Sequence, residues 1–238
     1  MIFKNIFKRG RKVDILRILF CNIAWMDYYK GIVPGMDEPK GGGSYVKENS
    51  DAYEKYNFDA ISLTEEVGYP TGEYCIGFVE TKSTNGKTKN QLKIEKIEGC
   101  EACKTEEQVE DVLVVYCALY PDAIKKETYV VGWYKHATVY RNYKVLRFPL
   151  EDTERYYTQE YNAIAKKEDC VLLPRPVRRK ANLWRVPRKS KGVAYGFGQS
   201  NVWFAQGKED NEYLHRFLDK IVKQIEEYDG ENWIDKRI

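Results

Sequence analysis

The sequence predicts a predominantly β protein of the α+β class, folded as a small β-barrel or a strongly curved sheet, with peripheral helices and one amphipathic helix near the C-terminus. Two observations lead to this fold class. Short runs of β-branched and aromatic residues alternate with turn residues along most of the chain, and only one long stretch repeats apolar residues securely at helical spacing. Hydrophobic residues make up 43% of the 238 residues, which is enough for a substantial core.

The strands are predicted from their apolar patterns. Residues 14–25 are densely apolar and residues 112–119 are continuously β-branched or aromatic, so both should be buried inside a sheet. Residues 129–141 could form one bent strand or a tight pair of strands. Shorter strands are expected at 45–46, 74–80, 92–97, 171–173 and 201–205, and the polar stretch 83–90 is typical of a turn.

Helices are expected in two places. Residues 214–228 place apolar side chains three and four positions apart, and Asp210 or Asn211 can cap the start of this helix. Residues 154–167 form the second predicted helix. We therefore divide the chain into three parts: a basic N-terminal arm (1–12), a barrel-like recognition domain (13–206), and a C-terminal helix that packs on the domain or on a partner (207–238).

The composition narrows the class of protein. Six cysteines stand at scattered spacings and no signal-peptide pattern is present, which indicates a reducing compartment and predicts a cytoplasmic protein. The apolar run 15–25 is broken by Arg17 and Asn22, so no membrane span is expected. The net charge is only +3, but basic and acidic residues are segregated along the chain.

Few residues could support catalysis or metal binding. His136 and His215 are the only histidines and neither lies in a nucleophile motif, so a Ser–His or Cys–His enzyme is not favoured. Cys100 and Cys103 form a close pair, but zinc would need two more ligands, which only Cys75, Cys117 or His136 could supply through space. We expect no bound metal and no cofactor.

One enzymatic alternative stays open. Glu80 and Lys82 stand two residues apart at the end of a predicted strand, an arrangement that Mg²⁺-dependent nucleases use to hold the ion and steady the attacking water. A second acid such as Asp59 would have to lie beside them. A third reading is a protein-interaction module whose C-terminal helix docks on another subunit.

The strongest binding signal is the stretch RPVRRKANLWRVPRKSK at residues 175–191, which has no acidic residue. Prolines 174, 176 and 187 should hold it extended, and Trp184 offers a stacking face. Cationic side chains can meet phosphates. The predicted contacts to a nucleic-acid backbone are Arg141, Arg175, Arg178, Arg179, Lys180, Arg185, Arg188 and Lys189.

Aromatic and amide side chains could form a pocket for a base. A flipped base is held by flat side chains on its faces and by amide or carboxylate groups on its edge. Asp27 and Asn57 could also contribute to the edge. The predicted pocket residues are Asn22, Trp25, Tyr28, Tyr29, Trp133, Tyr134, Gln199, Ser200, Asn201 and Trp203.

Five phrases carry a resemblance to a known family: FCNIAWMDYYKG (20–31), GGGSYV (41–46), VVGWYKHATVYR (130–141), LLP (172–174) and GQSNVWFA (198–205). Together they resemble a bacterial domain found ahead of HNH nuclease modules in modification-dependent restriction enzymes. Such domains are similar to the EVE, YTH and PUA group of small β-barrels that flip out a modified base. No HNH constellation follows residue 206 here, so the resemblance implies a reader whose nuclease is a separate partner.

The sequence thus predicts a DNA-binding domain that recognises a modified base by base flipping into an aromatic pocket, in restriction or phage defence. The resemblance implies that Trp25, Trp133, Tyr134 and Trp203 line this pocket. Its expected partners are DNA, a nuclease, or a second copy of the chain through the C-terminal helix. The chain itself is expected to be a binding module without its own nuclease centre.

Overall fold

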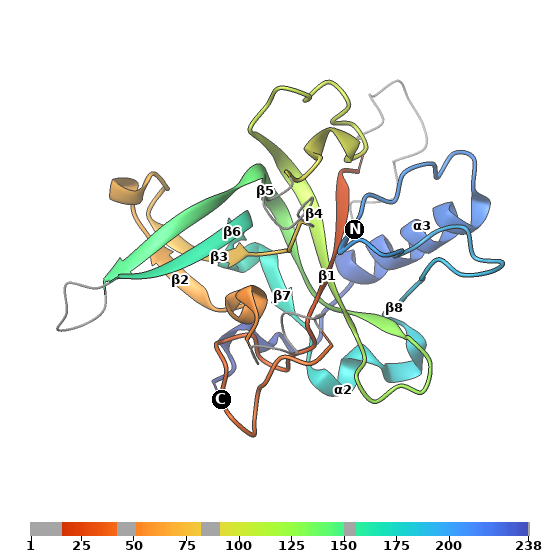
Figure 1. Ribbon diagram of the computed structural model, residues 1–238, viewed down its shortest axis with the longest axis horizontal. Coiled ribbons are helices and arrows are strands. Elements are labelled where there is room, and N and C mark those ends of the chain that lie inside the picture. The colour runs from red at the N-terminus through yellow and green to blue at the C-terminus, as the bar shows by residue number, and fades with distance from the viewer. Residues whose placement is uncertain (1–15, 42–50, 82–90, 150–155, 238) are drawn as a thin grey trace.

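The structure is a computed structural model, and it describes residues 16–41, 51–81, 91–149 and 156–237. The predicted basic arm (1–12), the strand at 45–46 and the turn at 83–90 lie outside these residues. Within the described ranges one sheet runs through the centre of the molecule, and helices and loops cover it on both sides (Figure 1).

Nine strands form this sheet: β1 Ile18–Ile23, β2 Ala60–Leu63, β3 Gly72–Gly77, β4 Gln108–Leu119, β5 Thr128–Pro149, β6 Tyr156–Lys166, β7 Cys170–Leu172, β8 Arg185–Val186 and β9 Val202–Trp203. Their order is β2-β3-β6-β5-β4-β1-β9, and β7 and β8 also pair with β5. β1 is parallel to β4, whereas the other pairs are antiparallel. The predominantly β class is confirmed. The described strands do not close into a barrel, because the pairing ends at β2 and β9.

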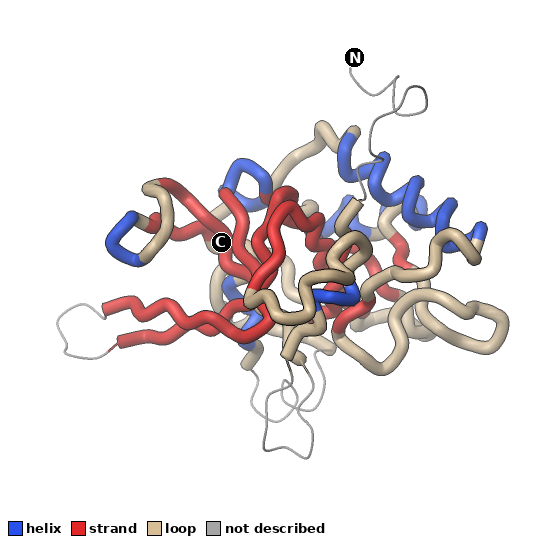
Figure 2. Tube along the Cα trace, turned by 90° about the horizontal axis from the view of Figure 1, so that it is seen from above, coloured by secondary structure: helices blue, strands red, loops and turns tan. Residues whose placement is uncertain are grey.

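Strand β5 pairs with more strands than any other strand of the described sheet. One edge pairs with β4, from Thr128 opposite Leu119 to Tyr140 opposite Gln108. The other edge pairs in turn with β8, β7 and β6. The predicted segment 129–141 is therefore one strand and not a tight pair, and it continues to Pro149. The last part of β5 and the first part of β6 form a hairpin that projects from the rest of the molecule, on the side away from the C-terminal helix (Figures 1 and 2).

Both faces of the central strands are buried. Leu19, Cys21 and Ile23 of β1 point into one core cluster, while Ile18 and Phe20 point into another on the opposite face. The residues of β4 divide between the same two clusters in the same alternating way. Since side chains alternate along a strand, a strand covered on two sides must be apolar at every position, which explains the continuous runs in the sequence.

Helix α3, Glu212–Glu226, covers one face of the sheet (Figure 2). Leu214, Leu218, Ile221 and Ile225 pack against the second cluster, and the Asn211 side chain caps the helix by accepting a hydrogen bond from the Leu214 amide at 3.0 Å. The predicted amphipathic helix is confirmed. It packs on the chain's own sheet. Among the described residues, no helix has the length and apolar character needed to cross a bilayer.

Two secondary-structure predictions are wrong. The described part of segment 154–167 is strand β6, because Tyr156 to Tyr161 pair with the long free edge of β5 and this pairing outweighs any helical preference. Leu92, Ile94 and Ile97 are buried but lie in a 3-10 turn and its flanks. Short 3-10 helices occur at Tyr53–Tyr56, Glu65–Val67, Ile94–Lys96, Lys167–Asp169, Lys180–Asn182 and Trp233–Asp235.

The first part of the basic segment is not extended. Residues Arg175–Arg178 form the short helix α2, followed by the 3-10 helix Lys180–Asn182. Pro176 is compatible with this helix because its missing N–H falls in the first turn, where the amides have no partner within the helix. The prediction that the prolines hold this stretch extended is therefore wrong for residues 175–182, whereas Arg185–Val186 form the extended strand β8.

The first prediction tests the contact between β5 and β7. A Cβ atom at Gly132 would lie 2.3 Å from the Val171 carbonyl oxygen and 2.5 Å from the Phe58 ring. We expect Gly132→Ala to lower the free energy of unfolding by at least about 2 kcal/mol, because a rigid backbone atom would have to move. Urea unfolding measures this, with Gly72→Ala as the matched control.

At Gly72 the added Cβ would meet only the Tyr74 ring, at the ordinary contact distance of 3.5 Å. That variant should unfold within about 0.5 kcal/mol of the wild type. Equal stability of the Gly132 and Gly72 variants would contradict the close approach of β5 and β7.

Candidate nucleic-acid interface

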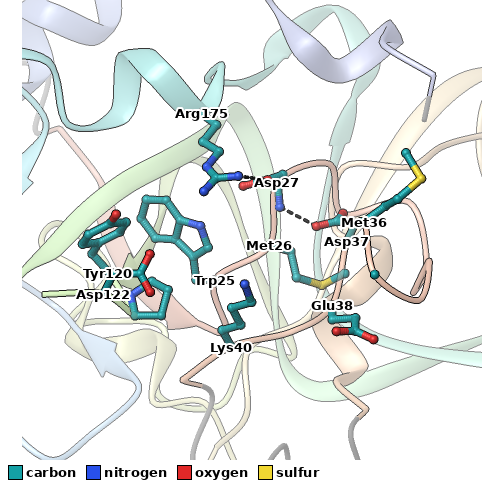
Figure 3. Close-up of a pocket in the computed structure, with 12 residues that line it drawn as sticks. Trp25, Met26, Asp27, Met36, Asp37, Glu38, Lys40, Tyr120, Asp122 and Arg175 are labelled. Atoms are coloured by element: carbon teal, nitrogen blue, oxygen red, sulfur yellow. Dashed lines mark hydrogen bonds and ion pairs between the residues drawn. The ribbon is translucent and has the colours of Figure 1, made fainter.

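A pocket of about 170 Å³ opens where three segments of the chain meet (Figure 3). Its lining comes from the loop after β1, the turn after β4 and the start of α2. The lining residues that carry the chemistry are Trp25, Asp27, Lys40, Tyr120, Asp122 and Arg175. A cavity of about 150 Å³ engineered in another protein binds benzene. This pocket therefore has room for one aromatic ring.

A buried carboxylate holds the loop that carries Trp25. Asp37 accepts hydrogen bonds from the backbone amides of Asp27, Tyr28 and Tyr29 at 2.6, 2.8 and 3.1 Å. Burial raises the pKa of Asp37, although the three amides stabilise its charged form. Two backbone hydrogen bonds also join Trp25 to the far end of the loop. Hydrogen bonds therefore hold the loop backbone at two places, and its side chains project from this fixed backbone.

Arg178 ties α2 to this loop. Its side chain is fully buried, and the guanidinium donates to the carbonyl oxygens of Leu173, Met26 and Asp27 at 2.9, 2.5 and 2.7 Å. It also lies 5.3 Å from the centroid of the Trp25 ring. Burial lowers the pKa of Arg178, because the desolvated cation loses its hydration. Contrary to the prediction from sequence, Arg178 does not reach the surface and cannot contact phosphate in this structure.

Two aromatic rings form the walls of the pocket. Trp25 and Tyr120 meet edge to face, with centroids 5.2 Å apart and planes at 70°. The Arg179 guanidinium lies 3.8 Å from the centroid of the Tyr120 ring, which is a cation–π contact. Flat apolar surface and positive charge therefore stand side by side at the pocket.

Several of the remaining lining side chains are charged. Arg175 pairs with Oδ2 of Asp27 at 3.0 Å, as the dashed line in Figure 3 shows. The other carboxylate oxygen, Asp27 Oδ1, is buried and has no hydrogen-bond partner among the described residues. Asp37, Glu38, Lys40 and Asp122 also belong to the polar part of the lining. The pocket thus offers both hydrogen-bond donors and acceptors to a ring that enters it.

Most of the other cations of the basic segment are exposed. Arg185 pairs with Glu127 at 3.4 Å, yet half of its side chain stays open to solvent. Arg188 is half-buried and donates to Thr128 and to the Gly198 carbonyl. The exposed basic residues of this stretch are Arg175, Arg179, Lys180, Arg185, Lys189 and Lys191. Of these, Arg175 lines the pocket and Arg179 contacts Tyr120 in its wall.

Arg141 has a structural position that the sequence did not indicate. It is 7% exposed, and its guanidinium donates to the carbonyl oxygens of Glu106 and Cys103 and to the Glu95 carboxylate. These contacts hold the 91–107 segment against β5. Because its donors are occupied within the fold, Arg141 is not available to a nucleic-acid backbone, contrary to the prediction.

Three predicted pocket residues pack inside the protein. Trp133 is 1% exposed and stacks on Trp184, with centroids 5.4 Å apart, so neither ring offers a free face. Tyr134 is fully buried on the opposite side of the sheet. Trp203 is half-buried and stacks on Phe20 at 4.7 Å. The structure does not bring these side chains to the Trp25 pocket.

Tyr28 and Tyr29 flank the pocket from within the fold. Tyr28 stacks on Trp233, with centroids 5.2 Å apart and planes at 7°. Tyr29 is fully buried, and its hydroxyl donates to the Ala24 carbonyl oxygen at 2.7 Å. Both rings support the loop, and Trp25 is the only predicted aromatic residue that lines the pocket.

The predicted amide readers form a separate group. The backbone N–H of Asn22 donates to the backbone carbonyl oxygen of Asn201 at 2.7 Å, where β1 meets β9. The side-chain amide of Asn201 donates to the Glu80 carboxylate at 3.3 Å. Ser200 accepts a hydrogen bond from the Val202 amide, and Gln199 is exposed. None of these side chains lines the Trp25 pocket. Asn57 is buried and bonds the backbone of Phe78.

The metal-dependent alternatives have little support in the part of the chain that the structure describes. Glu80 is exposed and Lys82 lies outside the described residues. In the described ranges no three His, Cys, Asp or Glu side chains are grouped as metal ligands would be. Cys100 and Cys103 are free thiols joined by a backbone hydrogen bond, and burial raises the pKa of Cys100. Among the described residues, no further side chains are therefore placed to complete a zinc site with these two cysteines.

Comparison with known proteins gives no relative: no family model, no curated protein and no solved structure matches this chain. The candidate site therefore rests on its own geometry.

Sequence reasoning missed most of the pocket lining. Tyr120 and Asp122 follow the central strand β4, and Lys40 ends the loop after β1. The sequence signal that could have identified Tyr120 is its place directly after the buried part of β4, where a turn brings side chains to the rim of a sheet. Nothing in the sequence relates this turn to a loop 80 residues earlier.

The second prediction concerns Arg178. Replacing it by Gln leaves buried carbonyl oxygens without donors, so we expect the free energy of unfolding to fall by about 3 kcal/mol. Arg179→Gln is the matched control, because Arg179 is exposed and its contact with Tyr120 should contribute only about 0.5–1 kcal/mol. Chemical denaturation compares the two variants. A loss below about 1 kcal/mol for Arg178→Gln would refute its anchoring role.

Proposed function

We propose that this protein binds nucleic acid and holds one extruded base against the aromatic wall formed by Trp25 and Tyr120, while neighbouring cations meet the phosphate backbone. The observation that carries the proposal is a pocket of single-ring size whose aromatic walls adjoin the exposed cations of α2 and the residues after it. An extruded base needs flat partners for its faces and polar groups for its edge, and this pocket supplies both.

Stacking supplies affinity without strict sequence preference. A base stacked on an aromatic side chain typically contributes about 1–3 kcal/mol. Trp25 is held by its loop and is only 4% exposed, so it would form a fixed floor, whereas Tyr120 is half-buried beside a turn. A base that enters the pocket would contact Tyr120 on the more open side.

The cations account for attraction to a polyanion. Arg175 and Arg179 lie at the pocket, and Lys180 follows them directly. Three phosphate contacts would release about three counterions from a nucleic acid, so binding should weaken steeply with salt. The sequence resemblance to recognition domains favours DNA with a modified base as the partner, and a separate nuclease as the protein that acts on it.

The third prediction tests the electrostatic part of the proposal. Replacing Arg175, Arg179 and Lys180 together by Gln should weaken binding of a fluorescent DNA oligonucleotide at least about tenfold at low salt and reduce the salt slope by about 2–3. Fluorescence anisotropy over a series of salt concentrations measures both quantities.

The matched control changes three exposed cations of α3, namely Arg216, Lys220 and Lys223. Helix α3 lies away from α2 (Figure 1). The control variant should leave affinity and slope within about twofold of the wild type. If both triple variants lose affinity equally, the surface around α2 is not the interface.

The fourth prediction tests the aromatic wall. Tyr120→Ala removes the half-buried ring, so affinity for the oligonucleotide should fall about tenfold, which corresponds to about 1.4 kcal/mol, while the salt slope stays unchanged. Tyr213→Ala, at a ring that is 71% exposed on α3, is the control and should bind like the wild type. Unchanged affinity of the Tyr120 variant would exclude stacking at this pocket.

A further inference from the structure

The loop between β4 and β5, residues 120–127, carries a fully exposed apolar side chain. The relative exposure of Ile124 is 105%, and Tyr213, the next most exposed large apolar residue that the structure describes, reaches 71%. A single exposed apolar side chain is common on protein surfaces and by itself indicates no function. The surroundings of Ile124 distinguish it.

The same loop forms part of the pocket. Tyr120, Pro121 and Asp122 line the pocket, and Ile124 follows Asp122 by two positions. Two residues of extended chain span at most about 7 Å, so Ile124 stands next to the pocket. The loop also lies beside α2, where Arg179 contacts the Tyr120 ring (Figure 1).

Hydrogen bonds hold the base of this loop. The Tyr120 amide donates to the Glu127 carbonyl oxygen at 2.9 Å and so closes the loop. The Glu127 carboxylate accepts a hydrogen bond from the Tyr129 hydroxyl at 2.9 Å and pairs with Arg185 at 3.4 Å. The Tyr129 hydroxyl also lies 3.0 Å from the side-chain oxygen of Asn182. Ile124 therefore projects from a loop that is fixed to the segment after α2.

Cations follow the apolar side chain directly. Lys125 and Lys126 are exposed, and the next acidic group, Glu127, is paired within the fold. The tip of the loop thus presents an apolar group together with positive charge. Proteins that deform duplex DNA combine the same two elements, since cations meet the phosphates and an apolar side chain enters the base stack.

An extruded base leaves a gap in the duplex. The gap and the extruded base belong to the same nucleotide position, so a side chain that fills the gap must stand beside the pocket that holds the base. Isoleucine is one of the residues that proteins insert between base steps. Ile124 has the required position, the required exposure and an apolar side chain.

We infer that Ile124 is an apolar wedge that enters the base stack of duplex DNA and fills the gap left by the base in the pocket. The inference rests on the proposed function and adds to it a duplex partner and the residue that keeps the base extruded. Lys125 and Lys126 meet the phosphates beside the gap. Ile124 acts as a positioning residue, because it does not touch the extruded base.

The experiment compares a duplex with a single strand. The duplex is a short fluorescent DNA with one thymine–thymine mismatch at its centre, where extrusion is least unfavourable, and the single strand is one of its two strands. Ile124→Ala should weaken duplex binding about tenfold, because the carbon atoms beyond Cβ no longer become buried in the stack. Binding of the single strand, which has no gap to fill, should stay within about twofold.

A second readout reports the stack itself. 2-Aminopurine placed next to the mismatch fluoresces more strongly when it is unstacked. Saturating wild-type protein should raise this fluorescence, and Ile124→Ala should lose at least about half of the rise, because the wedge that separates the bases is gone.

Two further variants control the experiment. Ile124→Leu keeps an apolar side chain of similar size and should restore duplex binding to within about twofold of the wild type. Val145→Ala shortens a half-exposed side chain on the hairpin of β5 and β6 and should bind both DNAs like the wild type. Because Ile124 and Val145 are exposed, all these variants should unfold at the same urea concentration as the wild type.

The outcomes separate the two proposals. If the wild type binds neither DNA, the proposed function fails and the inference fails with it. If both DNAs bind with steep salt dependence and loss on Tyr120→Ala, but Ile124→Ala binds the duplex like the wild type, the proposed function stands and the wedge is refuted. An equal loss for duplex and single strand would also refute it, because Ile124 would then make a contact that needs no gap.

Discussion

The buried guanidinium of Arg178 is the interaction on which the site depends. A fully desolvated cation is stable only when its donors are satisfied, and three backbone carbonyl oxygens do this. Two of them belong to the loop after β1, more than 150 positions earlier in the chain. One side chain therefore fixes the position of α2 relative to Trp25 and Asp27, and so determines the shape of the pocket.

The sheet supplies the second constraint. Because both faces of β1 and of the central parts of β4 and β5 are covered, a large aromatic residue within these parts fills the core. Trp133 and Tyr134 are adjacent in β5 and point into the two different clusters. Trp25 and Tyr120 lie just past the ends of β1 and β4, which run parallel to each other. Parallel neighbouring strands bring their ends to the same edge of the sheet, and the pocket forms there.

The arginines divide in the same way, into those that stabilise the fold and those that face solvent. Arg141 and Arg178 stand near other cations in the sequence. Each nevertheless donates its hydrogen bonds to backbone carbonyl oxygens and so stabilises the fold. Arg175 and Arg179 belong to the same helical segment as Arg178 but point outward, one to Asp27 and the other to Tyr120. A helical turn separates neighbouring cations onto different faces, so adjacent residues acquire opposite roles.

The sequence by itself determined the predominantly β class, the buried strands β1 and β4 and the capped helix α3. Those features follow from local patterns of apolar residues and from one capping residue, which a single stretch of chain contains in full. It also pointed to Trp25, Arg175 and Arg179. Only the tertiary structure decided that β6 is a strand, that Trp133 and Arg178 are buried, and that Tyr120 and Lys40 share a pocket with Asp27. These outcomes depend on pairing, burial and contacts between segments far apart in the chain, and no local pattern records which distant segment will satisfy a strand edge or a buried charge.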